Sequence, residues 1–255
     1  MKKILVYGSV NIDSTFIVNH IVNEGETLSS TNHFVGAGGK GANQAVAIAK
    51  ALHKENIKVY FGGKVGNDGE WILSKLNGYG VNTSFVSNSP NGTGQAIIQL
   101  DKDGKNSIIL FGGGNQEITK EEIIKVFEFF SAGDILVING EVNNLSLMFE
   151  MALSKSMDVV VNPSPVSESV LSLPLEKAKI LIVNEIEGAM LCNSFDSSLE
   201  ELLNLLMKKY PNTEIVLTAG SRGSYFGYKK EVYYQDIVKV QVVDTVGAGD
   251  TFLGY

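Results

Sequence analysis

The fold is decided by Ile180-Leu-Ile-Val183, Ser198-Leu-Glu-Glu201 and Ile215-Val-Leu217, which follow one another between residues 180 and 217. The two apolar runs are short and unbroken, as in parallel strands that are buried on both faces. The Ser-x-x-Glu spacing between them matches a capping box, which starts a helix. This stretch therefore predicts a strand, a helix and a second strand.

The same alternation continues on both sides of this unit. Further strand-like runs lie at Lys3–Tyr7, Lys58–Phe61, Ile135–Ile138 and Val159–Val161. Helical patterns lie at about 42–55, 67–78, 119–131, 144–155 and 198–210. The chain is therefore predicted to be α/β, with a doubly wound, mainly parallel sheet flanked by helices. Ligands bind such sheets beyond the C-terminal ends of the strands.

Two segments break the alternation and predict a small β-sheet lid. Residues 13–36 contain two apolar stretches around a polar loop, and residues 93–111 form a hairpin pattern with its turn at Asp103-Gly104. A small sheet with one apolar face is marginal alone and usually finds a cover. We expect a single α/β domain over residues 1–255, whose lid closes over the site and pairs with a second subunit.

Composition and charge exclude several classes of protein. The 255 residues are 44% hydrophobic and carry a net charge of −7, which suits a globular domain and disfavours a nucleic-acid partner. Cys192 is the one cysteine, so no intramolecular disulfide forms, and the three histidines are too scattered for a zinc site. The apolar run after Lys3 is too short for a signal peptide, and no run approaches a membrane span of ~18 residues. We expect a cytoplasmic protein without a membrane partner.

The stretch Gly36-Ala-Gly-Gly-Lys-Gly41 matches the G-x-G-x-x-G pattern of dinucleotide-binding enzymes, but its context is wrong. That pattern should follow the first strand directly, and here it comes about thirty residues after Lys3–Tyr7. The acid expected after the next strand is also missing, since Lys58–Phe61 runs into Gly62-Gly63-Lys64. A nicotinamide oxidoreductase is therefore disfavoured, and we expect no NADH binding.

Five polar or glycine-rich turns are predicted near strand ends. They are Val10-Asn-Ile-Asp13, Gly38-Gly-Lys-Gly-Ala-Asn-Gln44, Gly140-Glu141, Asn184-Glu-Ile-Glu187 and Thr218-Ala-Gly-Ser-Arg-Gly223. Each has a simple structural explanation when taken alone, such as an Asx turn, a glycine-rich turn or a helix cap. Together they suit a ligand rich in hydroxyls, and Asn184 with Glu187 suits a hydrated Mg²⁺.

A further motif closes the chain. The strand-like run Ile237–Val243 leads into Asp244-Thr-Val-Gly-Ala-Gly-Asp250, after which a helix is expected. A glycine turn before a helix gathers free backbone N–H groups beside the Asp250 carboxylate. That arrangement suits holding an anion while a hydroxyl is deprotonated.

Taken together, these motifs resemble the ribokinase family of ATP-dependent sugar and nucleoside kinases, from Lys3 to Tyr255. Gly-Glu-Thr27 and Asn-Pro-Ser-Pro165 add to the match, and the two glycine motifs are its most specific parts. The first of these, Gly38–Gln44, is more similar to the ribose-phosphorylating members than to fructose or adenosine kinases. The resemblance implies phosphorylation of the primary hydroxyl of a pentose, D-ribose above others, with ATP, Mg²⁺ and K⁺ or another monovalent cation.

The resemblance also implies a role for each site residue. Asp250 is the implied base, and the backbone N–H groups of Gly247, Ala248 and Gly249 form an anion hole. The implied sugar-binding residues are Asn11, Asp13, Gly38, Gly39, Lys40, Asn43, Glu141 and Asp250. Those implied to bind ATP are Asn184, Thr218, Gly220, Ser221, Arg222, Gly223 and Gly249. Glu187 is expected near Mg²⁺, and Asp244 and the Val246 carbonyl at the monovalent cation.

Family members continue well past the Gly-Ala-Gly-Asp turn, whereas five residues follow Asp250 here. We therefore expect that a C-terminal part is missing and that the short final helix leaves an apolar face exposed. Two alternatives stay open: a kinase for another furanose or a nucleoside, and a non-catalytic sugar-binding remnant.

Overall fold

The computed structural model describes residues 2–241 and 247–255. Its main sheet has nine strands in the order β13-β12-β11-β10-β9-β8-β1-β4-β5. The strands are β1 (Lys3–Tyr7), β4 (Lys58–Val65), β5 (Val81–Asn88), β8 (Ile135–Asn139), β9 (Asp158–Asn162), β10 (Ile180–Asn184), β11 (Glu214–Thr218), β12 (Ser224–Tyr228) and β13 (Glu231–Gln235). All neighbours from β5 to β11 pair in parallel, and β12 and β13 pair antiparallel. The predicted α/β fold with a mainly parallel sheet is confirmed.

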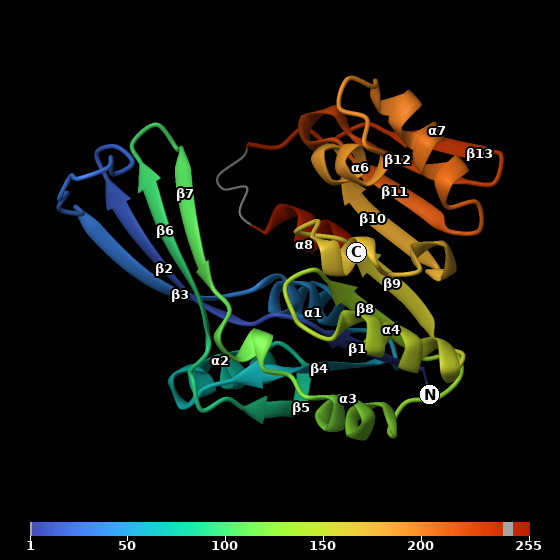
Figure 1. Ribbon diagram of the computed structural model, residues 1–255, viewed down its shortest axis with the longest axis horizontal. Helices are drawn as coiled ribbons and strands as arrows, with labels where there is room; N and C mark the ends of the chain where they lie inside the picture. The colour runs from blue at the N-terminus through green and yellow to red at the C-terminus, as the bar shows by residue number, and fades with distance from the viewer. Residues whose placement is uncertain (1, 242–246) are drawn as a thin grey trace.

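Helices cover both faces of this sheet (Figure 1). They are α1 (Lys40–Ala51), α2 (Glu70–Gly78), α3 (Lys120–Phe127), α4 (Leu145–Ser154), α5 (Glu168–Leu171), α6 (Glu185–Cys192), α7 (Leu199–Lys209) and α8 (Ala248–Gly254). The predicted capping box is present at Ser198, which precedes α7, and a second one is present at Thr119, which precedes α3.

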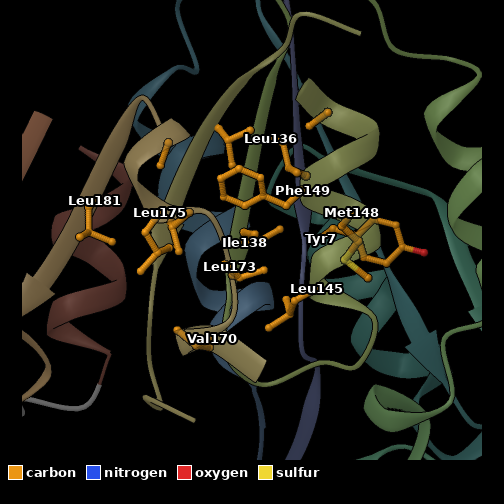
Figure 2. Close-up of a cluster of buried hydrophobic side chains, with 14 of the residues drawn as sticks. Tyr7, Leu136, Ile138, Leu145, Met148, Phe149, Val170, Leu173, Leu175 and Leu181 are labelled. Carbon is orange, nitrogen blue, oxygen red and sulfur yellow. The ribbon is translucent and has the colours of Figure 1, made fainter. Parts of the chain in front are cut away.

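Alternation along the strands divides the core into two layers. In β1, Leu5 and Tyr7 belong to one buried cluster, and Ile4 and Val6 belong to the other. Successive side chains of a strand point to opposite faces, so the two clusters lie on opposite sides of the sheet. Figure 2 shows the first cluster, in which Tyr7, Leu136 and Ile138 of the sheet lie against Met148 and Phe149 of α4. The second cluster joins the sheet to α1 and α2.

The two segments that interrupt the alternation form a separate four-stranded sheet, the lid. Its order is β3-β2-β6-β7, from β2 (Asn11–Val18), β3 (Asn32–Gly38), β6 (Gly94–Asp101) and β7 (Asn106–Phe111). Figure 1 shows these strands standing away from the main sheet. The lid carries exposed apolar side chains, including Phe34, Ile109 and Phe111. Because β2 begins four residues after β1 ends, the lid is anchored at the edge where the strands of the main sheet finish.

The prediction of a strand at Ile237–Val243 was wrong over its described part. Residues 237–241 are irregular, and the last strand within residues 2–241 and 247–255 is β13, which ends at Gln235. The strand that follows β12 forms earlier in the chain than predicted. β12 and β13 are joined by Lys229 and Lys230 in a hairpin, in which aromatic residues face one another across the strands. The rings of Tyr225 and Tyr234 lie 4.9 Å apart. Such cross-strand pairs stabilise a local hairpin.

The final helix packs closely on α1. A Cβ added to Gly254, the last residue of α8, would meet the backbone of α1, with Ala47 C at 2.6 Å and Ile48 N at 2.7 Å. Exposed apolar side chains remain on α8 and just after it, at Phe252 and Tyr255. Among the described residues, no helix combines the length and the apolar character that crossing a membrane requires.

We expect Gly254→Ala to destabilise the protein by about 1–3 kcal/mol, since the added methyl group overpacks the contact between α8 and α1. Gly78 is the matched control, because it is also the last residue of a helix and a Cβ there would meet nothing within 4 Å. Gly78→Ala should be neutral or gain up to ~1 kcal/mol through helix propensity. Thermal unfolding of the two variants measures the difference, and equal melting temperatures would contradict close packing of α8.

Candidate active site

The site lies where the direction of the sheet order reverses. From β1 the chain builds the sheet outward through β4 and β5 on one side, and then crosses over to build it through β8 and the later strands on the other side. This is the topological switch point at which open α/β sheets bind ligands. One cavity opens at this edge, and a second runs along α1 as far as Lys50 and Tyr79, near the ends of α1 and α2; the two share Gly247 as a lining residue. The lid-side cavity, about 470 Å³, is lined by Asp13, Ala37, Asn43, Lys50, Tyr79 and Gly247 among others. The strand-end cavity, about 140 Å³, is lined by Lys40, Asn162, Ile182, Asn184, Glu187, Thr218 and residues 247–250, with Val183.

Asp13 brings a carboxylate to the lid-side cavity whose ionised form is unfavourable there. Its Oδ1 atom is buried and has no hydrogen-bond partner among the described residues. Burial, and secondly the nearby Glu141 carboxylate, raise the pKa of Asp13 to about 6. Gly38 lies against this carboxylate, since a Cβ at that position would collide with both oxygens. An unsatisfied carboxylate oxygen is costly, so the arrangement favours a ligand that donates hydrogen bonds to Asp13.

Glu141 and Lys40 meet beside Asp13. The Glu141 carboxylate accepts hydrogen bonds from the Ser9 hydroxyl and from the backbone N–H of Lys40, the latter at 3.2 Å. Glu141 lies two residues after β8, and Lys40 is the first residue of α1. The polar turns predicted to gather at the strand ends are therefore in contact in the folded chain.

Gly39 is required by backbone geometry. It caps α1 with φ of 92°, and a Cβ there would lie 2.7 Å from Val10 Cα and 2.8 Å from the Ser9 carbonyl oxygen. The left-handed region and the close approach both favour glycine. The glycine block thus lets α1 begin directly against the turn after β1.

Asn115 is a site residue that the sequence did not reveal. It is 3% exposed, and its Nδ2 atom donates to Asn11 Oδ1 at 2.8 Å, while its Oδ1 atom accepts from Val10 N at 3.0 Å. It follows β7, so it links the two ends of the lid across the chain. The only signal was its position in Gly112-Gly-Gly-Asn115, a glycine run at the end of the predicted hairpin.

Asp250 lies in the first turn of α8 and is 8% exposed. Asn43 Nδ2 donates to its Oδ2 atom at 3.1 Å, and Gln44 Nε2 donates to its Oδ1 atom at 3.0 Å. Gly247 caps α8 with φ of 69°, and Ala248 and Gly249 line the strand-end cavity with Asp250. The structure thus places the last motif directly against the Gly38–Gln44 block, although residues 237–241 ahead of it are irregular.

The residues predicted to bind ATP divide into two groups. Asn184 and Thr218 line the strand-end cavity with Gly249. The short turn Gly220–Arg222 lies outside that lining, with Ser221 exposed and Arg222 paired to Glu185 at the start of α6. Gly223, with φ of 83°, packs on the Gln235 backbone and serves the β12–β13 hairpin.

Asn184 and Glu187 form a capping box on α6. Glu187 N donates to Asn184 Oδ1 at 2.8 Å, and Asn184 N donates to Glu187 Oε2 at 2.9 Å. The helix-cap alternative is thus present in the structure, and both residues still line the strand-end cavity. Carboxylate oxygen facing a polar cavity fits Mg²⁺, which keeps several waters and takes few protein ligands.

No cluster of three or more His, Cys, Asp or Glu side chains suited to a metal occurs within residues 2–241 and 247–255. Asp244 and Val246, predicted to bind a monovalent cation, lie outside the described residues.

Comparison with known proteins agrees with this geometry. The model of the pfkB family of carbohydrate kinases matches residues 1–254. A ribokinase from Staphylococcus aureus (strain COL) is 31% identical over 99% of this chain and 84% of its own length. A deoxyribokinase from Salmonella typhi is 30% identical over 98% of this chain and 83% of its own.

Among solved structures, Arabidopsis thaliana ribokinase complexed with ribose and ATP superposes with a TM-score of 0.81. It is 28% identical, and the match covers 99% of this chain and 83% of that one. With its sheet, lid and two glycine motifs, the chain belongs to the pfkB family of carbohydrate kinases, enzymes that transfer a phosphoryl group to an alcohol.

Proposed function

We propose that this protein transfers the γ-phosphoryl group of ATP to the primary hydroxyl of a pentose, D-ribose above others, forming ribose 5-phosphate. One observation carries the proposal: the lid-side and strand-end cavities share Gly247, and the Asp250 carboxylate, which lines the strand-end cavity, accepts a hydrogen bond from Asn43, which lines the lid-side cavity. A sugar in the first cavity and a triphosphate in the second would bring acceptor and donor together at this carboxylate.

The lid-side residues suit a sugar. Asp13 and Asn43 line the lid-side cavity and offer an acceptor without a partner among the described residues and an amide. Asn11 and Glu141, which line a further cavity of about 240 Å³ with Asn115, offer another amide and a second carboxylate. The glycines 38 and 39 and the first turn of α1 at Lys40 allow a ligand to approach the backbone closely. Several oriented hydrogen bonds of this kind hold a polyhydroxyl ligand in one pose.

Asp250 accepts the proton of the primary hydroxyl in this proposal. The hydroxyl oxygen then forms the new bond to the γ-phosphorus, and the bond from that phosphorus to the β–γ bridging oxygen breaks, releasing ADP. Phosphoryl transfer passes through a loose transition state, so positioning and electrostatics count for more than strong basicity. The backbone N–H groups of Gly247, Ala248 and Gly249 are proposed to stabilise the transferring group.

The strand-end cavity is proposed to hold the ATP phosphates, with Asn184 and Thr218 in its lining and residues 220–223 at its margin. When bound, Mg²⁺ would neutralise phosphate charge, and we propose that Glu187, which lines this cavity, holds its waters. Asp244 and the Val246 carbonyl stay predicted ligands of K⁺ or another monovalent cation.

The acceptor is tested with a sugar panel in a coupled ADP-release assay with ATP and Mg²⁺. We expect ribose to give the highest kcat/KM, and K⁺ to raise the rate over a K⁺-free buffer. Because a deoxyribokinase and a ribokinase are about equally similar, deoxyribose is the second candidate. Preference for a nucleoside or a hexose would contradict the proposed pentose, and no turnover with any acceptor would contradict a kinase.

We further propose that the lid joins two subunits into a homodimer. The exposed apolar side chains on β3 and β7, among them Val35, Ile109 and Phe111, support an interface there. Light scattering should give twice the 27.5 kDa chain mass. Replacing Ile109 with a charged residue should halve the measured mass. A wild-type mass of one chain would contradict the proposal.

A further inference from the structure

Gln44 is a fully buried polar side chain whose amide is bonded at both ends. It lies on α1 with 0% exposure. Its Nε2 atom donates to Asp250 Oδ1 at 3.0 Å and to Asn162 Oδ1 at 3.2 Å. Its Oε1 atom accepts from Asn139 Nδ2 at 3.4 Å. The side chain therefore joins the ends of β8 and β9 to the first turn of α8.

The chain of amides continues at both ends. Asn139 Oδ1 accepts from the backbone N–H of Glu141 at 3.2 Å, and Asn162 Nδ2 donates to the Ile182 carbonyl at 3.0 Å. We name Asn139, Gln44 and Asn162 the amide relay. It runs from Glu141, beside Asp13, to β10 at the strand-end cavity, and Asp250 is bonded to its centre.

The backbone groups at its ends fix the direction of the relay. The Glu141 N–H can only donate, so Asn139 presents its oxygen there and its NH₂ group to Gln44. The Ile182 carbonyl can only accept, so Asn162 presents its NH₂ group there and its oxygen to Gln44. Both ends therefore force Gln44 to present its NH₂ group toward Asp250.

An NH₂ group directed at Asp250 selects one protonation state. An ionised carboxylate accepts at both oxygens, whereas a carboxylic acid carries a donor on one of them. Asn43 donates to the other oxygen, so both carboxylate oxygens face amide donors. Hydrogen bonds to the charged form favour that form. The other charged groups that line this cavity are Lys40 and Glu187.

We propose that Gln44 is a positioning residue that keeps Asp250 ionised and directed at the acceptor hydroxyl, with Asn139 and Asn162 fixing the orientation of Gln44. This inference rests on the proposed function, in which Asp250 is the base. The simpler alternative is that Gln44 only fills a polar part of the core.

Two variants of Gln44 separate these alternatives. Gln44→Glu places a second carboxylate against Asp250, and close carboxylates compete for one proton. We expect the acid limb of the kcat profile to move up by about one unit or more, so that kcat on that limb falls about 10-fold or more below wild type and recovers as the pH rises. Gln44→Met removes the donors without adding charge and should give a smaller shift in the same direction.

The control is Gln235→Glu, an exposed glutamine on β13 that should leave the profile unchanged. KM for the sugar should change little in the Gln44 variants, since the lid-side residues are untouched. A Gln44→Glu enzyme that loses the same fraction of activity at every pH would reduce Gln44 to a structural role and overturn the inference.

A readout without turnover keeps the inference separate from the proposed function. In protein labelled with ¹³C at aspartate carboxyl carbons, the Asp250 signal, assigned by its loss in Asp250→Asn, should titrate at higher pH in Gln44→Glu than in wild type. Equal titration would reject the relay even in an active kinase. An inactive wild type with shifted titration would reject the kinase and keep the relay.

Discussion

Replacing Asp250 with asparagine is expected to lower kcat by about 10³-fold or more, because the variant has no carboxylate in the strand-end cavity to accept the hydroxyl proton. Sugar binding should persist, since the unpartnered Asp13 oxygen, Asn11 and Glu141 remain in place. The coupled ADP-release assay gives kcat, and calorimetric titration with the sugar gives Kd.

The amide relay sharpens this expectation. Asparagine at position 250 presents one oxygen and one NH₂ group, whereas Asn43 and Gln44 both direct NH₂ groups at this side chain. The amide relay fixes the orientation of Gln44, so the oxygen of the amide introduced at position 250 should accept from the Gln44 NH₂ group. The NH₂ group of the introduced amide then faces the NH₂ group of Asn43, and the Asn43 side chain should turn away. Asp196→Asn, an exposed change on the loop before α7, is the control for charge loss. Turnover near wild type in Asp250→Asn would refute the assignment of the base.

Most of the fold was predictable because the central strands are simple in pattern. The runs at β1, β8, β9, β10 and β11 are continuously apolar. Both faces of β1 and β8 belong to buried clusters, whereas the second face of β10 and β11, with Ile182 and Val216, is half-buried. The edge strand β5 escaped prediction because Val81–Asn88 mixes polar and apolar residues and is largely half-exposed. β13 escaped for a similar reason, since all five of its residues are exposed.

The candidate site was predictable where strand ends carry conspicuous residues. Asp13 and Glu141 converge after β1 and β8 as the parallel topology requires, and the contact of Asn43 with Asp250 comes from the packing of α1 against α8. Asn115 and Gln44 acquire their roles only through tertiary contacts more than one hundred residues apart in the chain. No local pattern indicates that a glutamine in the first turns of α1 will meet an aspartate of α8. The turn at 220–222 is the opposite case: its sequence is conspicuous, but its residues lie outside the lining of the strand-end cavity.

Asp13→Asn is expected to make the protein more stable at pH 8 and a poor sugar binder. The folded chain raises the pKa of Asp13 from 3.8 to about 6, by burial first and by the Glu141 charge second. Well below its ordinary pKa of 3.8 this group is protonated in both the folded and the unfolded chain. As pH rises from there to the folded pKa of about 6, the unfolded chain loses the proton while the folded chain keeps it, so stability is lost over this range and the loss is complete above it.

Asparagine does not titrate and therefore avoids that loss. The melting temperature of Asp13→Asn should equal that of wild type near pH 4 and exceed it by a few degrees at pH 8. Asp196→Asn, at an exposed position, should show no such divergence. Parallel melting curves for Asp13→Asn and wild type across this range would show that the burial of the Asp13 charge costs nothing.

The same carboxylate should bind the sugar best when it is ionised, because charged acceptors form stronger hydrogen bonds with hydroxyls. Asp13→Asn should therefore weaken sugar binding about 100-fold or more at pH 8, whereas wild-type Kd should rise as pH falls below about 6. A sugar that donates to the unpartnered Oδ1 atom stabilises the ionised form, so binding near pH 6 should release a proton. Calorimetry in two buffers with different ionisation enthalpies measures this release. Binding without proton release would mean that the sugar leaves Asp13 unpartnered, whereas release that is absent from Asp13→Asn would assign the linked proton to this carboxylate.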